Sequence, residues 1–138
     1  MSDIQVDQEH ASGRAPRVAS VQRVVTEADT AAAYGPDFPP AAATPFVLGL
    51  AEVACHQVVL PDLASGEVTV GTSASIEHLL PSPVGATLVA SATLTHTEGR
   101  RLSFQVEVHD GPDLCARVAH DRAVVRIDKI NARLAART

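Results

Sequence analysis

Hydrophobic residues run almost without a break through one segment of the chain. Residues 46–60 read FVLGLAEVACHQVVL, preceded by Thr44 and Pro45 and followed by Pro61. A hydroxyl residue at the N-cap and a proline in the first turn are typical of a helix start. The segment therefore predicts one helix over residues 45–60 with Thr44 as its N-cap. Because apolar side chains surround this helix, we expect it to be buried on all sides.

The remaining hydrophobic residues alternate with polar ones, which is the pattern of strands. Leu102, Phe104, Val106 and Val108 give the clearest alternation, and turn residues rich in Gly, Pro, Asp and Ser separate the segments. The pattern predicts a β-rich stretch over residues 16–25 and a short helix over residues 27–34. Four long strands are predicted over residues 67–79, 86–98, 101–110 and 114–127, and a final short helix over residues 128–136.

This order of elements predicts an α+β fold. Short turns between consecutive strands favour an antiparallel meander, and a long sheet must twist and curl. A curled sheet can cover an apolar helix on most sides, so we expect the antiparallel sheet to wrap around the central helix. Residues 1–15 are polar and without a sustained period, and are expected to form a flexible N-terminal arm before a single domain over residues 16–138.

Length and composition narrow the function classes. The chain has 138 residues, enough for one domain, and only 3% aromatic residues with no Trp. Together with a net charge of −5, this argues against a nucleic-acid partner. We find no apolar run of membrane-spanning length and no signal peptide, and we expect a cytoplasmic protein. Cys55 and Cys115 are far apart and fit neither a disulfide framework nor a metal site, so no metal is expected.

Glu52 is the most informative residue because it is the only carboxylate of the apolar helix. A carboxylate buried without a partner costs several kcal/mol. None of its helical neighbours is a cation, and His56 at position i+4 is the one possible partner within the helix. Misplaced ionisable groups concentrate at active sites, so a catalytic role is favoured over a structural hydrogen bond to a strand or to another subunit.

Other polar residues carry weaker signals. Thr44 stands at the helix N-terminus, where free N–H groups and the positive end of the helix dipole can stabilise an oxyanion. His78 follows a strand and, taken alone, is more typical of a structural residue, and so are His10, His96, His109 and His120. No serine-hydrolase elbow, P-loop, dinucleotide motif or zinc-protease motif is present.

Several stretches together resemble a known family. They resemble the fluoroacetyl-CoA thioesterase family of hotdog enzymes. The similar stretches are the run from Ala43 to Cys55, the pair Gly71 and Thr72 followed by His78, and the segments 83–85, 98–104 and 122–132. The resemblance covers residues 16–134. It implies a hotdog fold paired into a homodimer, and hydrolysis of a short acyl-CoA without a metal or organic cofactor other than the CoA of the substrate.

The resemblance also implies roles for individual residues. Glu52 would be the nucleophile or general base, His78 its acid/base partner, and Thr44 the residue that positions the carboxylate and the thioester. The backbone N–H of Gly71 would hold the carbonyl oxygen. Phe38 matches one of two phenylalanines that cover the acyl pocket in the family, and Arg122 would lie near the CoA moiety.

Two positions depart from the family. Gly35 stands where the second phenylalanine of the lid would be, and Val53 replaces a larger aromatic residue after the glutamate. We therefore expect a general thioesterase for small acyl groups, without a particular selectivity for fluoroacetate.

Two other functions remain open at this point. A non-catalytic module that binds acyl-CoA or an acyl carrier would need no carboxylate beside the thioester. A hotdog hydratase or dehydratase would need an Asp/His pair in an overhanging segment, and the sequence does not indicate one.

Overall fold

The computed structural model describes residues 2–5 and 17–138. Between them the chain forms six strands, two α-helices and three short 3₁₀ turns. In order these are β1 (Ser2–Gln5), β2 (Val18–Val24), η1 (Glu27–Asp29), η2 (Ala31–Ala33), α1 (Thr44–Val59), η3 (Leu60–Asp62), β3 (Glu67–His78), β4 (Thr87–Glu98), β5 (Arg101–Asp110), β6 (Asp113–Arg126) and α2 (Ile127–Ala136).

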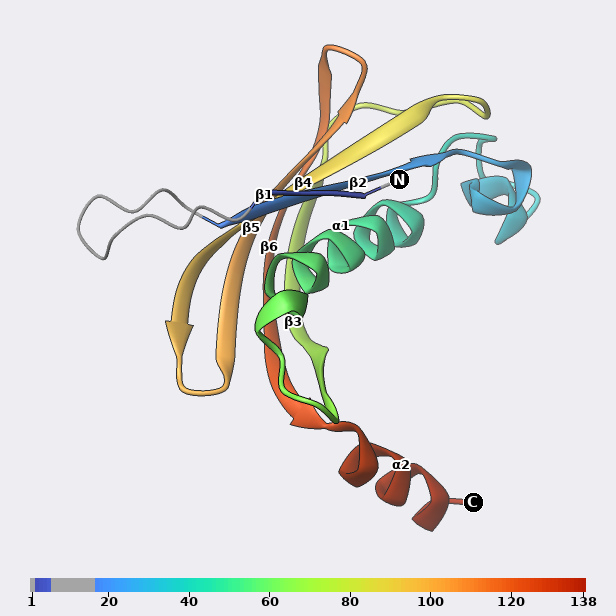
Figure 1. Ribbon diagram of the computed structural model, residues 1–138. Coiled ribbons are helices and arrows are strands. Elements are labelled where there is room, and N and C mark those ends of the chain that lie inside the picture. The colour runs from blue at the N-terminus through green and yellow to red at the C-terminus, as the bar shows by residue number, and fades with distance from the viewer. Residues whose placement is uncertain (1, 6–16) are drawn as a thin grey trace.

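The strands form one antiparallel sheet in the order β1-β2-β4-β5-β6-β3, and the sheet curves around α1 (Figure 1). The expected α+β architecture is confirmed, and the four long strands lie within one or two residues of their expected bounds. The arm expected over residues 1–15 falls mostly outside the described residues. Its described part, Ser2–Gln5, pairs with β2.

One face of α1 packs on the concave side of the sheet. Val47, Ala51, Ala54 and Val58 are fully buried there, against residues of the inner face such as Leu88. The small alanine side chains allow the helix to approach the strands closely, which compensates for the scarcity of aromatic residues. Alternate residues of β4 and β5 complete this core: Ala90, Ala92, Phe104, Val106 and Val108.

The expectation that α1 is buried on all sides is wrong for the single chain. Val53 is 49% exposed, and Phe46, Gly49 and Gln57 of the same side are only partly buried. The curled sheet covers one face of the helix, and the described part of the chain supplies no second layer for the other. An apolar surface left open in this way is typical of an interaction site.

The expectation that no apolar run reaches membrane-spanning length is wrong. The helical stretch Thr44–Asp62 has 19 residues and, by length and composition alone, is long and apolar enough to cross a membrane. In the structure the inner face of this helix forms the core of the domain, and the apolar composition follows from that packing.

Two local elements differ from expectation. The helix begins one residue early, so that Ala43 is the N-cap and Thr44 lies within the first turn. The helix expected over residues 27–34 is instead two 3₁₀ turns, because Thr30 has an extended backbone between them. Thr30 forms a β-bridge with Ala42, and this pairing interrupts the helix.

Candidate functional site

Glu52 points from the middle of α1 toward the edge of the sheet, which β6 and β3 form. Its Oε2 atom accepts a hydrogen bond from Nη1 of Arg122 on β6, at 3.2 Å. The Arg122 side chain is buried between helix and sheet, whereas the Glu52 side chain keeps 41% exposure. The partner of the helix carboxylate is therefore a cation 70 residues away in sequence, and not a neighbour on the helix.

Arg122 uses most of its protons within the protein. Its Nε donates to the hydroxyl of Thr69 at 2.8 Å, and its Nη2 donates to the carbonyl oxygen of Thr69 at 2.8 Å. A buried guanidinium is tolerated only when its donors are satisfied, and Thr69, Glu52 and His120 together meet this requirement. Arg122 is thus fixed in place and fixes the carboxylate in turn.

Hydrogen bonds define the tautomer of His120. Its Nδ1 lies 2.8 Å from the carbonyl oxygen of Ser73, which can only accept, so Nδ1 carries the proton. Its Nε2 lies 3.0 Å from Nη1 of Arg122, which can only donate, so Nε2 is the acceptor. His120 is neutral in this arrangement. Its 3.5 Å approach to Glu52 is therefore a contact and not an ion pair.

Gly71 leaves the space that the Glu52 carboxylate occupies. A Cβ atom at this position would lie 2.6 Å from Oε2 of Glu52 and 3.1 Å from Cε1 of His120. A β-bulge follows directly, between Gly71 and Ser73, and bends the edge strand at this point. Glycine is therefore required here for close approach of the carboxylate to the strand.

Two further titratable groups of α1 lie beside this cluster. Nδ1 of His56 is 2.6 Å from the Thr69 hydroxyl. Burial and, secondarily, the charge of Arg122 lower the pKa of His56, so that the neutral ring is favoured. The Cys55 thiol, three residues beyond Glu52 on α1, is fully buried. Its burial raises its pKa to about 12, with the Arg122 charge opposing this change and the Glu52 charge adding to it.

Thr44 and His78 form a separate pair. The Thr44 hydroxyl lies 2.8 Å from Nδ1 of His78, at the point where the start of α1 meets the end of β3. The Nε2 atom of His78 is buried and has no hydrogen-bond partner within residues 17–138. Thr44 is therefore not the N-cap that the sequence predicts, because its side chain is engaged by His78 and does not cap the helix.

The two groups of residues lie in different grooves. Glu52 and Arg122 line a groove of about 480 Å³ together with His56, Val68 and Ile127. Thr44 and His78 line another groove of about 300 Å³. The structure thus joins Glu52, Gly71 and Arg122 on one side, joins Thr44 and His78 on another, and does not bring the two sets together within one chain.

Phe38 lies in the loop between η2 and α1, where it is 56% exposed. Pro39 of the same loop lines the groove of Thr44 and His78, so Phe38 is next in sequence to a residue of that groove. Phe38 contacts neither Glu52 nor Arg122 through any hydrogen bond or ring contact, and its role as a pocket cover stays a prediction.

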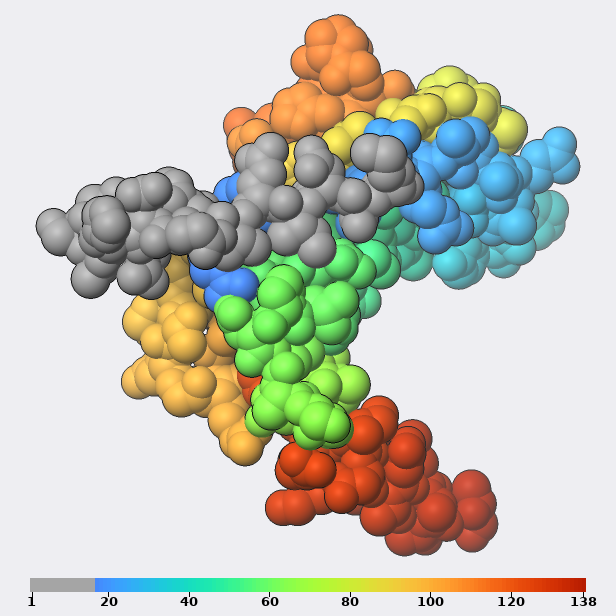
Figure 2. Space-filling model, in the orientation of Figure 1, coloured from blue at the N-terminus to red at the C-terminus, as the bar shows by residue number. Residues whose placement is uncertain are grey.

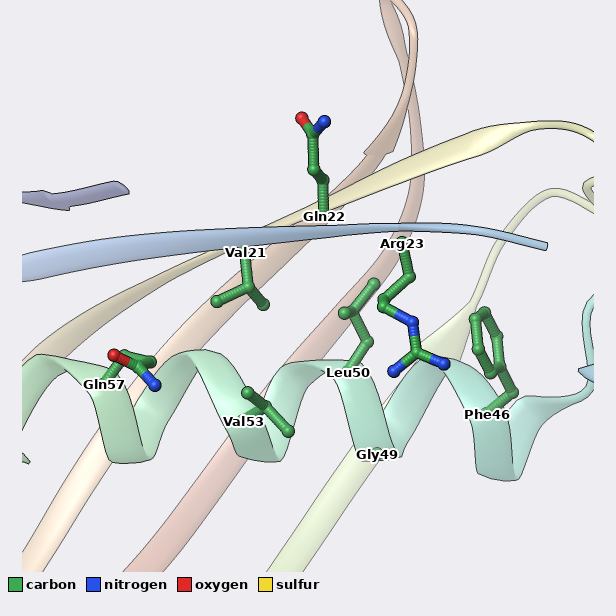
Figure 3. A pocket seen from close by; sticks show the side chains of 8 residues that line it. All are labelled: Val21, Gln22, Arg23, Phe46, Gly49, Leu50, Val53 and Gln57. Carbon is green, nitrogen blue, oxygen red and sulfur yellow. The ribbon is translucent and has the colours of Figure 1, made fainter. Parts of the chain in front are cut away.

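A third groove of about 480 Å³ separates β2 from the open side of α1 (Figure 3). Val21 and Arg23 point from β2 toward the helix, whereas Gln22 points away from it. The Arg23 guanidinium lies 5.9 Å from the centre of the Phe46 ring, a cation–π contact. This groove contains none of the residues expected to be catalytic and offers no acid or base.

The sequence predicts a structural role for His120 and no role for Thr69. A signal for His120 was available, because it precedes Arg122 by two residues on the same strand and therefore shares its face. Thr69 carries no comparable signal. Within residues 2–5 and 17–138, no cluster of three or more His, Cys, Asp or Glu residues could hold a metal ion.

Comparison with known proteins identifies close relatives. A family model described as fluoroacetyl-CoA-specific thioesterase matches residues 25–128. The fluoroacetyl-CoA thioesterase of Streptantibioticus cattleyicolor is 40% identical over 102 residues, which are 74% of this chain and 73% of that protein.

Solved structures agree with this comparison. A fluoroacetyl-CoA thioesterase structure superposes with a TM-score of 0.84 at 35% identity, over 91% of this chain and 97% of that chain. A mutant of the same enzyme, in complex with fluoroacetate and CoA, superposes with a TM-score of 0.80 at 36% identity, over 86% and 98%. A hot-dog-like protein from Thermanaerovibrio acidaminovorans, at 20% identity, shares the fold with a TM-score of 0.79 over 88% and 90%. The hotdog fold is thereby confirmed.

The buried position of Cys55 makes a testable prediction about thiol reactivity. Only the thiolate reacts with disulfide reagents, and a pKa raised to about 12 leaves almost none at about pH 8. Cys115 is buried as well, and its pKa is also raised, chiefly by burial. We expect neither thiol to react with Ellman's reagent in the native protein, and both to react after unfolding in denaturant. Rapid release of one equivalent from the native protein would contradict this prediction.

Proposed function

Because the chain belongs to the family of fluoroacetyl-CoA-specific thioesterases, we propose that it hydrolyses a short acyl-CoA in a site built from two copies of the chain. It is an acyl-CoA thioesterase, and the proposal concerns its substrate size, its residues and its assembly. One copy supplies Glu52, Gly71 and Arg122, and the other supplies Thr44 and His78. The separation of these two sets within a single chain is the observation that carries the proposal.

The separation follows from element geometry. Glu52 is eight residues beyond Thr44 on α1, about 12 Å along the helix axis. His78 is seven residues beyond Gly71 on β3, about 23 Å along an extended strand. A thioester that contacts Glu52 is therefore out of reach of His78 of the same chain. A second copy can supply the missing pair.

The edge of the sheet supports such an assembly. β3 is one of the two edge strands, and its residues 71–75 (GTSAS) are exposed, small and uncharged. Exposed edge strands normally carry charges or prolines that prevent pairing, and this segment carries neither. Antiparallel pairing of two β3 strands about a two-fold axis at Ser75 sets His78 of each copy opposite Thr72 of the other, next to Gly71.

The proposed chemistry then uses each side chain in turn. The Glu52 carboxylate either attacks the thioester carbonyl carbon, giving an anhydride that water then hydrolyses to the free acid, or removes a proton from a water molecule that attacks this carbon. The Gly71 N–H holds the carbonyl oxygen. His78 of the other copy, oriented through Nδ1 by Thr44, protonates the departing CoA sulfur through Nε2. Nε2 has no hydrogen-bond partner within residues 17–138, which leaves it able to donate, although the ring must become accessible in the assembly because this atom is buried in the single chain. The mechanism uses no metal or organic cofactor besides the CoA of the substrate.

The Glu52→Gln variant tests the role of the carboxylate. It keeps the side-chain shape but removes the base, so we expect kcat to fall by about 10²–10⁴-fold with little change in substrate affinity. Release of CoA thiol from acetyl-CoA measures the rate, and thermal unfolding confirms the fold. Hydrolysis at the wild-type rate would make the carboxylate structural. Binding of CoA esters by a wild-type protein that hydrolyses none would favour the non-catalytic module.

Mixing two inactive variants tests the shared site. Glu52→Gln and His78→Ala chains are unfolded together, refolded and assayed. A mixed dimer retains one intact site, so an equimolar mixture should recover about a quarter of wild-type activity. Each variant refolded alone is the control. Recovery of no activity by mixtures whose dimers are shown to form would place both residues in one chain and overturn the proposal.

The Gly71→Ala variant tests the close approach of Glu52 to the strand. The added methyl group would occupy the position 2.6 Å from Oε2, so the carboxylate must move. A displacement of about 1 Å can cost about 10²-fold in rate. Because Gly71 does not have a positive φ, alanine fits the backbone and the melting temperature should change little. Unchanged kcat in a folded variant would show that this approach is not needed.

Acyl-chain length tests the covering role proposed for Phe38. The loop that carries it contains Pro36, Pro39 and Pro40, which restrict its backbone and leave the ring available to close a small pocket. We expect higher kcat/KM for acetyl-CoA than for palmitoyl-CoA, and a smaller difference in Phe38→Ala. Equal values for the two substrates in the wild-type protein would remove the argument for a small pocket.

A further inference from the structure

Positive charge is concentrated at the C-terminal end of a chain that is acidic elsewhere. Residues 126–138 hold four of the 11 Lys and Arg residues but only one of the 16 acidic residues. The net charge of the whole chain is −5. A polyanionic ligand is repelled by such a protein unless it meets a local positive surface.

These cations border a groove between α2 and the end of β6. The groove, of about 540 Å³, is lined by the cations Arg100, Arg126, Lys129 and Arg133 and by apolar residues that include Val124 and Ile130. No acidic residue is among its lining residues. Figure 2 shows α2 standing out from the rest of the molecule at this end, so that the helix is accessible to a ligand.

The cations differ in how far they are already neutralised. Nη1 of Arg100 lies 3.7 Å from Glu67, and Nε of Arg126 lies 3.4 Å from Asp128. Within residues 17–138, neither Lys129 nor Arg133 forms an ion pair with a carboxylate. These two side chains, on successive turns of α2, are therefore the ones available for an external anion.

We propose that this groove binds the 3′-phosphorylated adenosine diphosphate end of the CoA substrate. Its phosphates would contact Lys129 and Arg133, with Arg126 beside them, and its adenine ring would lie on the apolar residues between the cations. Guanidinium groups match phosphate geometry well, and a flat ring over aliphatic side chains removes apolar surface from water. The inference rests on the proposed function, because it places the remote end of the same substrate.

The groove is also in the right place relative to Glu52. Ile127, the first residue of α2, lines the groove of Glu52 and Arg122. Arg126 is four residues beyond Arg122 on β6, about 13 Å along the strand. The pantetheine arm separates the thioester from the phosphates of CoA and can follow this path. Arg122 itself is not available to phosphate, because Glu52, His120 and Thr69 already take its donors.

Substrates with and without phosphates test this assignment. The double variant Lys129→Glu with Arg133→Glu is compared with the wild-type protein on acetyl-CoA and on acetylpantetheine, which lacks the nucleotide. We expect KM for acetyl-CoA to rise about tenfold or more, because hydrogen bonds to charged groups are lost, and kcat to stay near its wild-type value. The kcat/KM for acetylpantetheine should not change.

A matched control separates the groove from the overall charge. Arg101→Glu with Arg117→Glu makes the same change in net charge at exposed positions outside the groove, and should leave KM for acetyl-CoA within about twofold of wild type. Lys129→Gln with Arg133→Gln provides a milder variant should charge reversal unfold α2, which circular dichroism would reveal. Equal effects on both substrates, or equal effects of the control, would overturn the proposal.

Direct titration with adenosine 3′,5′-bisphosphate tests the groove without catalysis. We expect calorimetry to detect binding to the wild-type protein and to the control variant, and loss of binding in the groove variants. Absence of binding to the wild-type protein, or equal affinity in the groove variants, would overturn the inference. If the wild-type protein binds this nucleotide but hydrolyses no acyl-CoA, the proposed function is contradicted and the nucleotide site is retained.

Discussion

A guanidinium buried between the central helix and the sheet has to find acceptors for its protons, and the site depends on how Arg122 does so. Its donors reach Thr69, His120 and Glu52. This arrangement sets the tautomer of His120 and holds the carboxylate of α1 against Gly71. One ion pair thus ties the helix to the sheet and prepares the group proposed to attack the thioester. Removing Arg122 would leave Glu52 without its only cationic partner within residues 17–138.

The surfaces that a single chain leaves uncovered lie next to this site. The open side of α1 includes Val53, and the exposed segment of β3 begins at Gly71, beside Glu52. Both are uncharged, and apolar helix faces and unprotected strand edges are ordinarily covered by a partner. The proposed second copy would cover the strand edge with its own β3 and bring His78 to Glu52. Assembly and catalysis would then depend on the same surfaces.

Local pattern was sufficient for most of the fold, and it failed where long-range pairing competed with it. Alternation predicted the four long strands, and the apolar run predicted α1. Thr44 had the sequence of an N-cap, but the approach of His78 engaged its hydroxyl, and the helix starts one residue earlier. The segment 27–34 had the composition of a helix, yet the bridge between Thr30 and Ala42 divides it into two turns. In both places a partner more than ten residues away decided the conformation.

By itself the sequence predicted which residues carry the chemistry: the lone carboxylate of an apolar helix, and, through family resemblance, Thr44, His78, Gly71 and Arg122. It also determined the order of elements, because periodicity and turn residues act over a few positions. Only the tertiary structure decided which of these residues meet. Arg122 reaches Glu52 across 70 positions, His120 joins them, and His78 stays with Thr44. The physical reason is that such contacts depend on strand register and on the curvature of the sheet, which no local pattern encodes.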